Sequence, residues 1–386
     1  MHFIGGNQIK LLRSGAEYFP ALEQAIQNAT QEIYLQTYIY EIDEIGVRIG
    51  SALKQAAQRK VAVNLLLDGF GCKDFPKTYI HELESAGVRV MFYRPKISPW
   101  TLKRNRLRRL HRKVAVIDGE VAFVGGINII DDHNAPHKIP PRIDYAVRIE
   151  GALLPTIAAN VRRLWRRIAW IHLWRTNHNN VLQRLKPPAL STGSGIKVAF
   201  VIRDNVLHRR DIENAYLDAI NHAQSEIIIA NAYFVPGRRF RKALLDAAKR
   251  GVKVKLLLQG RMEYFLMFAT HAFYGVFLEN GIEIYEYRNS FMHSKVAVID
   301  NDWATVGSSN IDPFSLLLAH EANLLIQDRA FATELRIDIE ASMENGVHQV
   351  TSKSWINGNI LHRSLSWIAY GIVRFLLGVI GYSKEQ

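Results

Sequence analysis

One arrangement of reactive side chains occurs twice in this sequence. The pattern His-x-Lys-x-x-x-x-Asp has two copies, and its members are His111, Lys113 and Asp118 in the first and His293, Lys295 and Asp300 in the second. Each copy is followed at the same offset by Gly-x-x-Asn, which ends at Asn128 in the first and at Asn310 in the second. A single copy could arise from composition alone, but two copies with the same downstream asparagine indicate one shared site.

These side chains suit a phosphodiester substrate. Residues two apart in a strand share a face, so His111 and Lys113 should point the same way, as should His293 and Lys295. The lysines offset the charge of the anionic oxygens, and the asparagine amides donate hydrogen bonds to them. One neutral imidazole can attack phosphorus while the other, protonated, protonates the leaving oxygen. Water as acceptor makes a hydrolase and an alcohol makes a transferase; no metal or other cofactor is expected, because the lysines supply the positive charge.

Each histidine also needs a partner that orients its second ring nitrogen. Asp144 and Glu321 stand at equivalent positions of the two halves of the chain and are the candidates for this task. Asp118 and Asp300 begin the dipeptides Asp-Gly and Asp-Asn, which are typical of tight hairpin turns. A structural role is therefore open for these two aspartates beside the catalytic role that the motif predicts.

Two similar series of helices and strands must position these residues. In the first half, helices are expected over residues 18–29 and 49–59, and strands over residues 32–38 and 61–69. In the second half, helices are expected over residues 214–223 and 240–250, and strands over residues 226–231 and 252–260. Strands that alternate with helices predict an α/β fold, here two similar α/β lobes with the active site between them.

The repeat divides the chain into two lobes and two shorter segments. Residues 1–185 form a first lobe with the first motif, and residues 186–195 form a linker. Residues 196–350 form a second lobe with the second motif, and residues 351–386 form an amphipathic C-terminal segment for the membrane interface.

The composition indicates a globular, basic protein. Hydrophobic residues make up 48% of the 386 residues, and the formal net charge of +13 favours an anionic partner such as nucleic acid, an anionic membrane or a phosphorylated small molecule. The single cysteine, Cys72, excludes an intramolecular disulfide and a cysteine-based zinc site. The N-terminus lacks the basic start and apolar run of a signal peptide.

Three segments interrupt the repeat. Residues 99–109 carry five cations just before His111, and they form either a solvated loop or a rim that attracts anions. Residues 162–175 interleave tryptophan with arginine, as expected of a helix at a lipid interface or of a helix whose tryptophans pack on the sheet. Residues 355–382 are apolar but interrupted by Arg374, which favours a helix lying in the interface over a membrane span; a final core helix is the alternative.

With both motifs in view, the chain resembles the phospholipase D superfamily over nearly its whole length. Within that superfamily it is most similar to the B-type branch of the bacterial cardiolipin synthases. Residues 6–22 look like the start of that branch, and the two N-terminal membrane helices typical of the A-type enzymes are absent. The resemblance implies a phosphatidyltransferase of lipid metabolism that moves a phosphatidyl group onto phosphatidylglycerol through a phosphohistidine and forms cardiolipin. Glycerol is released when the donor is also phosphatidylglycerol.

The family pattern also suggests individual roles. The first-motif histidine is usually the nucleophile and the second-motif histidine the acid and base, which correspond to His111 and His293. The phosphate-binding positions of the family correspond to Lys113, Lys295, Asn128 and Asn310. The second motif has Ser308 where the first has Gly126, so Ser308 is expected to be an additional phosphate donor.

Two other classes of function compete with a transferase. A hydrolase of the same superfamily, acting on a lipid or a nucleic acid, would use the same catalytic residues. A catalytically silent nucleic-acid-binding protein would leave both His-Lys-Asn sets unexplained. The tryptophan-rich and apolar segments favour a lipid substrate over nucleic acid. The resemblance implies phosphatidylglycerol and the bacterial membrane surface as partners, and peripheral attachment to the inner membrane on its cytoplasmic face is expected with them.

Overall fold

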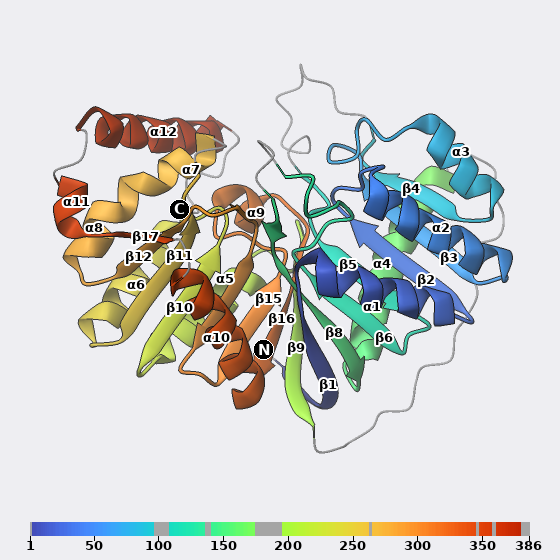
Figure 1. The fold of residues 1–386 in the computed structure, drawn as a ribbon, viewed down its shortest axis with the longest axis horizontal. Helices are drawn as coiled ribbons and strands as arrows, with labels where there is room; N and C mark the ends of the chain where they lie inside the picture. Colours follow the sequence, from blue (N-terminus) through green and yellow to red (C-terminus); the bar gives the residue numbers. More distant parts are fainter. Residues whose placement is uncertain are drawn as a thin grey trace.

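The strands of both lobes join into one continuous sheet of fifteen strands (Figure 1). The computed structural model describes residues 2–95, 108–135, 140–173, 195–261, 265–344, 347–356 and 360–379. The predicted α/β class and the predicted pair of similar lobes are confirmed.

The first lobe alternates strands and helices as predicted. Its elements are β1 (Ile4–Arg13), α1 (Ser14–Asn28), β2 (Glu32–Thr37), α2 (Glu44–Gln58), β3 (Ala62–Asp68), α3 (Lys77–Ser85), β4 (Arg89–Tyr93), β5 (Lys113–Ile117), β6 (Val121–Gly125), β7 (Arg142–Ile143), β8 (Tyr145–Gly151) and α4 (Leu154–Leu173). Helix α2 begins where Asp43 caps it by accepting a hydrogen bond from Gly46 N (3.0 Å). The helix buries Ile49 and Leu53, four residues apart, against the sheet.

The second lobe repeats this order and then adds a C-terminal extension. Its elements are β9 (Ile196–Arg203), α5 (Asp211–His222), β10 (Glu226–Asn231), α6 (Arg238–Lys249), β11 (Lys253–Gln259), α7 (Phe265–Thr270), a 3-10 turn (His271–Phe273), α8 (Tyr274–Glu279), β12 (Glu283–Tyr287), β13 (Phe291–Met292), β14 (Lys295–Ile299), β15 (Trp303–Gly307), α9 (Pro313–Leu317), β16 (Glu321–Gln327), α10 (Arg329–Glu344), β17 (Val347–Val350), α11 (Ser352–Ile356) and α12 (Ile360–Val379). The predicted linker lies outside the described residues except for Gly195, so the predicted segment boundaries remain predictions.

The order of strands shows that the lobes are two copies of one unit. From the centre outwards the first lobe runs β1-β8-β6-β5-β2-β3-β4, and the second runs β9-β16-β15-β14-β10-β11-β12, with β17 added at the edge. The copies join where β1 pairs antiparallel with β9. Equivalent strands therefore lie at equal distances from the centre of the sheet.

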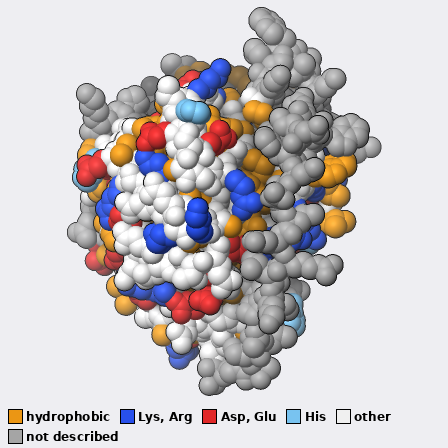
Figure 2. Space-filling model, turned by 90° about the vertical axis from the view of Figure 1, so that its right-hand side faces the viewer, with side chains coloured by type: hydrophobic (Ala, Val, Ile, Leu, Met, Phe, Trp, Pro, Cys, Tyr) orange, Lys and Arg blue, Asp and Glu red, His pale blue; other side chains and the backbone are white. Residues whose placement is uncertain are grey.

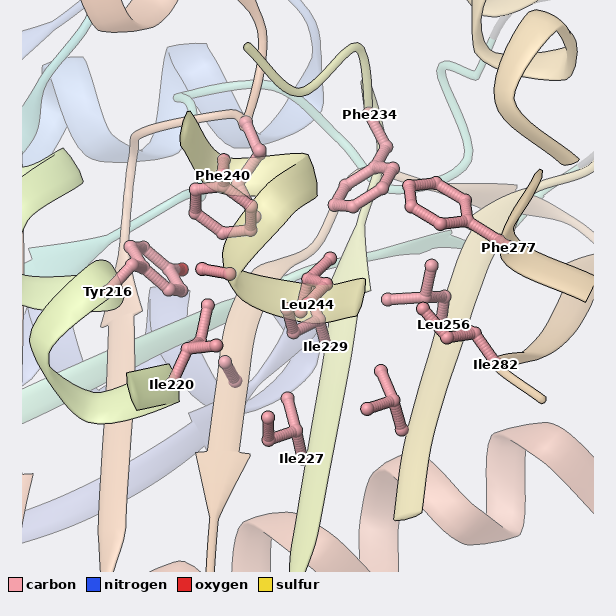
Figure 3. Packing of buried hydrophobic residues seen from close by; sticks show 14 of the residues in the cluster. Tyr216, Ile220, Ile227, Ile229, Phe234, Phe240, Leu244, Leu256, Phe277 and Ile282 are labelled. Carbon is pink, nitrogen blue, oxygen red and sulfur yellow. The ribbon is translucent and has the colours of Figure 1, made fainter. Parts of the chain in front are cut away.

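Buried side chains on both faces of the sheet form the core. Strand β3 is buried over nearly its whole length, as expected of a parallel strand covered by helices. In the second lobe, helices α5, α6 and α8 cover one face with an aromatic and aliphatic cluster that includes Tyr216, Phe240 and Phe277 (Figure 3). This packing holds the strands rigid where they carry the two motifs.

The features that bear on function lie at one end of the strands, across the middle of the sheet. We call this end the carboxyl edge, because the parallel strands β2 and β3, and likewise β10 and β11, end there. Strand β5 is antiparallel to β2, and β14 is antiparallel to β10, so Lys113 and Lys295 begin their strands at this edge. Ligands of open α/β sheets characteristically bind outside the carboxyl ends of the strands.

Candidate active site

Backbone hydrogen bonds between the lobes hold both motifs at the carboxyl edge. His111 N donates to His320 O (3.0 Å), and His293 N donates to Ile143 O (2.7 Å). Beside the second contact, β7 and β13 pair in parallel across the lobe boundary. The strand predicted to include His111 begins only at Lys113, because the backbone of His111 is bound by the other lobe.

Each histidine is oriented by a carboxylate from the opposite lobe. His111 Nδ1 lies 2.9 Å from Glu321 Oε1, and His293 Nδ1 lies 2.7 Å from Asp144 Oδ2. Both carboxylates are buried. A carboxylate accepts hydrogen bonds, so each Nδ1 carries a proton and each Nε2 is left for chemistry. The two residues predicted to orient the histidines are thus brought to them, and the pairing crosses between lobes.

The two orienting carboxylates are held in different ways. Glu321 Oε2 accepts a hydrogen bond from Ser308 Oγ, which itself accepts from Ala322 N (3.0 Å). Ser308 was predicted to bind phosphate, but the structure directs its hydroxyl to Glu321 instead. In the first lobe, a Cβ at Gly126 would lie 2.3 Å from Asp144 Oδ1, so a residue with a side chain there would displace the carboxylate. Gly126 therefore leaves room for the carboxylate of Asp144, whereas Ser308 at the equivalent position donates a hydrogen bond to the longer Glu321 side chain.

The two motif lysines lie buried beside the histidines. Lys113 Nζ donates to His111 O (2.7 Å), and Lys295 Nζ donates to His293 O. Lys295 Nζ also lies 3.6 Å from Asp144 Oδ2. Each ammonium is therefore on the same side of the chain as the histidine two residues before it, as the alternation of strand side chains predicts.

Burial sets the protonation states of this site. It lowers the pKa of Lys113 to about 7 and that of Lys295 to about 8. Burial also lowers the pKa of His111, although Glu321 partly opposes it, and it lowers the pKa of His293 further, with help from Lys295. Both imidazoles are therefore neutral near pH 7 in the free protein, while the lysines titrate close to that pH.

We expect a bell-shaped pH dependence of kcat/KM, which reports the free enzyme. Because the lysines lose their charge as pH rises through about 7 and 8, kcat/KM should fall on the alkaline side above about pH 8. A bound phosphodiester raises the pKa of both lysines, so kcat should decline at higher pH than kcat/KM. Initial rates between pH 5 and 10 at low and saturating substrate test this expectation; an alkaline limb at the same pH in both would contradict it.

The two motif asparagines are buried. Asn128 Oδ1 accepts a hydrogen bond from Ile39 N (3.0 Å), which directs the amide NH₂ away from Ile39. Asn310 Oδ1 is buried and has no hydrogen-bond partner in the described part of the chain. The NH₂ of Asn128 is thus left to donate to a ligand, whereas the unpaired atom of Asn310 is an acceptor, and the predicted contact of both amides with phosphate remains a prediction.

Asp118 and Asp300 lie at the far ends of β5 and β14, about 17 Å along the strand from the lysines. The carboxylate of Asp118 accepts hydrogen bonds from the backbone amides of Thr30, Gln31 and Glu32, and that of Asp300 accepts from those of Gln224, Ser225 and Glu226. Both aspartates have positive φ, 54° and 51°, in the hairpin turns. This position corresponds to the structural alternative rather than to the catalytic role, because each carboxylate ties its hairpin to the start of β2 or β10.

The sequence analysis did not single out several residues that the structure places near the histidines. The Tyr38 ring lies 4.8 Å from the His111 ring, and the Phe291 ring stacks near His293 at 6.1 Å. Asp68 Oδ2 accepts from Leu110 N (2.7 Å) and so fixes the segment that enters the first motif. Asp68 directly follows the buried run of β3, and a carboxylate at the carboxyl end of a buried strand is the signal that could have identified it.

No group of three or more His, Cys, Asp or Glu side chains is arranged to hold a metal ion within the ranges that the structure describes. The arrangement offers two imidazole Nε2 atoms and two ammonium groups at one place. Such a set can stabilise a phosphodiester, transfer its phosphoryl group to one histidine and protonate the leaving oxygen with the other.

Comparisons with known proteins agree with this chemistry. Residues 22–136 and 216–343 match the family model described as "Cardiolipin synthase, PLD-like domain". The chain is 39% identical over 379 residues to cardiolipin synthase B of Salmonella typhi and 38% identical to that of Escherichia coli, covering 98% of this chain and 90% of each relative. It is 29% identical over 340 residues to cardiolipin synthase 1 of Bacillus cereus, covering 87% of this chain and 66% of that one.

Solved structures with low sequence identity share the fold. The crystal structure of phosphatidylserine synthase from Haemophilus influenzae superposes with a TM-score of 0.71 at 16% identity, covering 97% of this chain and 95% of that one. Polyphosphate kinase from Porphyromonas gingivalis superposes with a TM-score of 0.58 at 13% identity, covering 98% of this chain and 54% of that one.

Proposed function

Because this chain belongs to the phospholipase D-like family of cardiolipin synthases, we propose that its site transfers a phosphatidyl group in two steps through a phosphohistidine. The enzyme is a phosphatidyltransferase that makes cardiolipin. The observation that carries the mechanism is that two His-Lys pairs meet at one site, each histidine held by the other lobe's carboxylate.

In the first step, the neutral Nε2 of His111 attacks the phosphorus of a donor phosphatidylglycerol. The bond between phosphorus and the headgroup glycerol oxygen breaks, and His293 Nε2–H protonates that oxygen. The anionic substrate raises the pKa of His293 when it binds, which supplies the protonated acid that the free protein lacks. Glu321 and Asp144 stabilise the positive charge on the two imidazoles during the step.

In the second step, a glycerol hydroxyl of another phosphatidylglycerol attacks the phosphorus. His293, now neutral, takes the hydroxyl proton, and the bond to His111 Nε2 breaks to release cardiolipin. Lys113 and Lys295 offset the charge of the phosphoryl oxygens in both steps, with Asn128 and Asn310 as additional donors. Water in place of the hydroxyl would produce phosphatidic acid instead.

Exposed hydrophobic side chains at the carboxyl edge support a lipid substrate and peripheral membrane attachment. Strand β8 runs away from the carboxyl edge, and the following helix α4, about 30 Å long, runs back towards it. The exposed Trp170 and Ile171 near the end of α4 therefore lie at the carboxyl edge. The loop after β9 exposes Val206 and Leu207 at the same edge, and Phe70 follows β3. Trp165, by contrast, is buried and packs near Tyr34, as expected of a helix whose tryptophans pack on the sheet, and among the tryptophans of this segment the membrane contact is proposed for Trp170 alone.

Helix α12 adds further exposed apolar side chains at this edge. It packs on α7, which follows the carboxyl end of β11, and both helices lie along the top of the second lobe in Figure 1. Its buried residues are Ser366, Ala369 and Val373, and its exposed apolar residues are Leu365, Trp367, Ile368, Ile372 and Phe375. The helix thus packs on the lobe and also presents an apolar side to solvent, as an interfacial helix does. None of the described helices is long and apolar enough to cross a bilayer.

A nuclease or another hydrolase is the second candidate. The described lysine and arginine side chains on the face seen in Figure 2 are interspersed with acidic ones, rather than forming one basic patch of the kind that tracks a nucleic-acid backbone. Nothing on that face therefore favours nucleic acid over the lipid substrate.

We propose that the protein attaches to the inner membrane, on its cytoplasmic face.

Purified protein in micelles that contain phosphatidylglycerol should form cardiolipin and glycerol in equal amounts, without added metal. Thin-layer chromatography of labelled lipid and an enzymatic glycerol assay measure the two products. The His111→Ala variant is the control for background hydrolysis. Phosphatidic acid as the only labelled product would identify water as the acceptor and contradict the transferase proposal.

Replacing Phe375 of α12 with serine should weaken binding to anionic vesicles about tenfold, because a large apolar side chain leaves the interface. The matched control is Ile337→Ser on α10, whose side chain is comparably exposed, 62% against 70%. Sedimentation with vesicles of phosphatidylglycerol and phosphatidylcholine measures the binding. Equal losses for the two variants would contradict a membrane contact through α12.

A further inference from the structure

A second basic cavity lies behind the catalytic histidines, on the face of the sheet that α4 covers. Its volume is about 190 Å³. Its polar lining includes Arg112, Asn160, Arg163, Arg167, Asp204 and His320. Because Arg112 alternates with His111 and Lys113, its side chain points to the opposite side of the chain from theirs. The cavity is therefore separate from the candidate active site.

Arg112 is the deepest charged group in this cavity. Its side chain is only 2% exposed. Nε donates to Gln36 Oε1 (2.6 Å) and Nη1 donates to Asn160 Oδ1 (2.7 Å), whereas Nη2 is buried with no hydrogen-bond partner in the described part of the chain. A buried guanidinium normally satisfies its donors with an acceptor or an anion, so the free Nη2 indicates room for a ligand that accepts hydrogen bonds.

The positive charge of the cavity is not balanced by the described part of the protein. Arg163 and Arg167 lie one turn apart on α4, and neither they nor Arg112 form an ion pair with a described carboxylate. Asp204 is the only acidic residue among those that line the cavity. Its Oδ1 instead accepts from the backbone amides of its own loop, including Val206 N (2.8 Å) and His208 N (2.9 Å).

Apolar side chains border the cavity at the carboxyl edge and also towards the start of α4. Val206 and Leu207, which line it, are 65% and 80% exposed at the carboxyl edge. A larger cavity of about 910 Å³ shares Asn160 and Arg163 with it and continues along α4, past apolar residues such as Phe200. A ligand with an anionic head and an apolar tail would match both parts.

We infer that this cavity is a second lipid site, which binds the phosphoryl group of an anionic phospholipid through Arg112, Arg163 and Arg167. Arginine suits this role because its planar guanidinium donates paired hydrogen bonds to phosphoryl oxygens. An acyl chain of the bound lipid would follow the apolar walls of the larger cavity. The site adjoins the catalytic pair through the backbone, since His320, which lines the cavity, accepts the hydrogen bond from His111 N.

Equilibrium dialysis with labelled dihexanoyl phosphatidic acid, below its micelle concentration, tests the inference by counting bound lipids. Two lipids should bind per wild-type chain, one at the catalytic site and one here. The double variant Arg163→Ala/Arg167→Ala should bind its second lipid about tenfold more weakly, whereas the neighbouring Arg166→Ala should retain both. All three arginines are exposed on α4, so the variants are matched, and their thermal unfolding midpoints should equal that of the wild type.

A single bound lipid in the wild type, or two undiminished sites in the double variant, would overturn the inference. Inorganic phosphate at the same free concentration should not displace the second lipid, and equal displacement would overturn the assignment to a lipid. Since dialysis measures occupancy and not turnover, the result is independent of whether cardiolipin is the product.

Discussion

The His293→Ala variant should lose cardiolipin synthesis by about 10⁴-fold yet still release one equivalent of p-nitrophenol from a phosphatidyl p-nitrophenol donor. p-Nitrophenol is a good leaving group that departs without a general acid, so His111 can still form the phosphohistidine. The intermediate should then accumulate, because no base activates the acceptor. The His111→Ala variant should lose both activities, since it lacks the nucleophile.

Stopped-flow absorbance measures the burst, and acid quenching with labelled donor measures the covalent intermediate. His133→Ala is the control, because that side chain is 77% exposed and lies outside the site. A burst in His111→Ala and none in His293→Ala would exchange the two roles. Full activity in either variant would remove that histidine from the mechanism.

The carboxylate variants should show that the catalytic pairs cross between the lobes. Asp144→Asn should behave like His293→Ala and keep the p-nitrophenol burst, although Asp144 belongs to the lobe that carries His111. Glu321→Gln should behave like His111→Ala and slow formation of the intermediate with either leaving group. Each amide fails to stabilise an imidazolium and favours the wrong tautomer, so losses of about 10⁴-fold in kcat are expected.

Rates with phosphatidyl p-nitrophenol, which has a good leaving group, and with phosphatidylglycerol, which has a poor one, separate these outcomes. Glu120→Gln serves as the matched control, because Glu120 is an exposed carboxylate in the hairpin beside Asp118. If Asp144→Asn impaired the His111 step instead, orientation would act within each lobe, contrary to the observed contacts. The double variant Asp144→Asn/Glu321→Gln should lose little more than the worse single variant if the pairs act in one reaction.

Much of the architecture could be predicted from local patterns. The apolar periodicity of residues 49–59 and the uniform hydrophobicity of residues 61–69 depend only on neighbouring residues, and the structure places α2 and β3 there. The boundaries differed by several residues at the start of α1 and α2, because side-chain caps and backbone contacts with other elements set the ends. The two copies of the His-x-Lys pattern could likewise be recognised, since each copy is one continuous stretch of the chain.

The sequence pointed to Asp144 and Glu321 as partners of the histidines, but local patterns did not predict the contacts of other residues in and beside the motifs. Ser308 follows a glycine in a motif that suggested phosphate binding, yet its hydroxyl supports Glu321. Asp118 and Asp300 belong to the motif but bind backbone amides at the opposite end of their strands. Arg112 stands between two motif residues and nevertheless points into a different cavity. Each outcome depends on which side of the sheet a side chain meets and on what another segment places there.

The sequence by itself determined the reactive groups, the two-lobed α/β class and the family, because these follow from residue types, spacing and periodicity along the chain. Only the tertiary structure decided that Asp144 serves His293 and Glu321 serves His111. It did so because β1 and β9 join the lobes edge to edge, which brings the carboxyl edges of both copies together. A contact between residues 149 or 210 positions apart is set by that junction, and no local pattern encodes it.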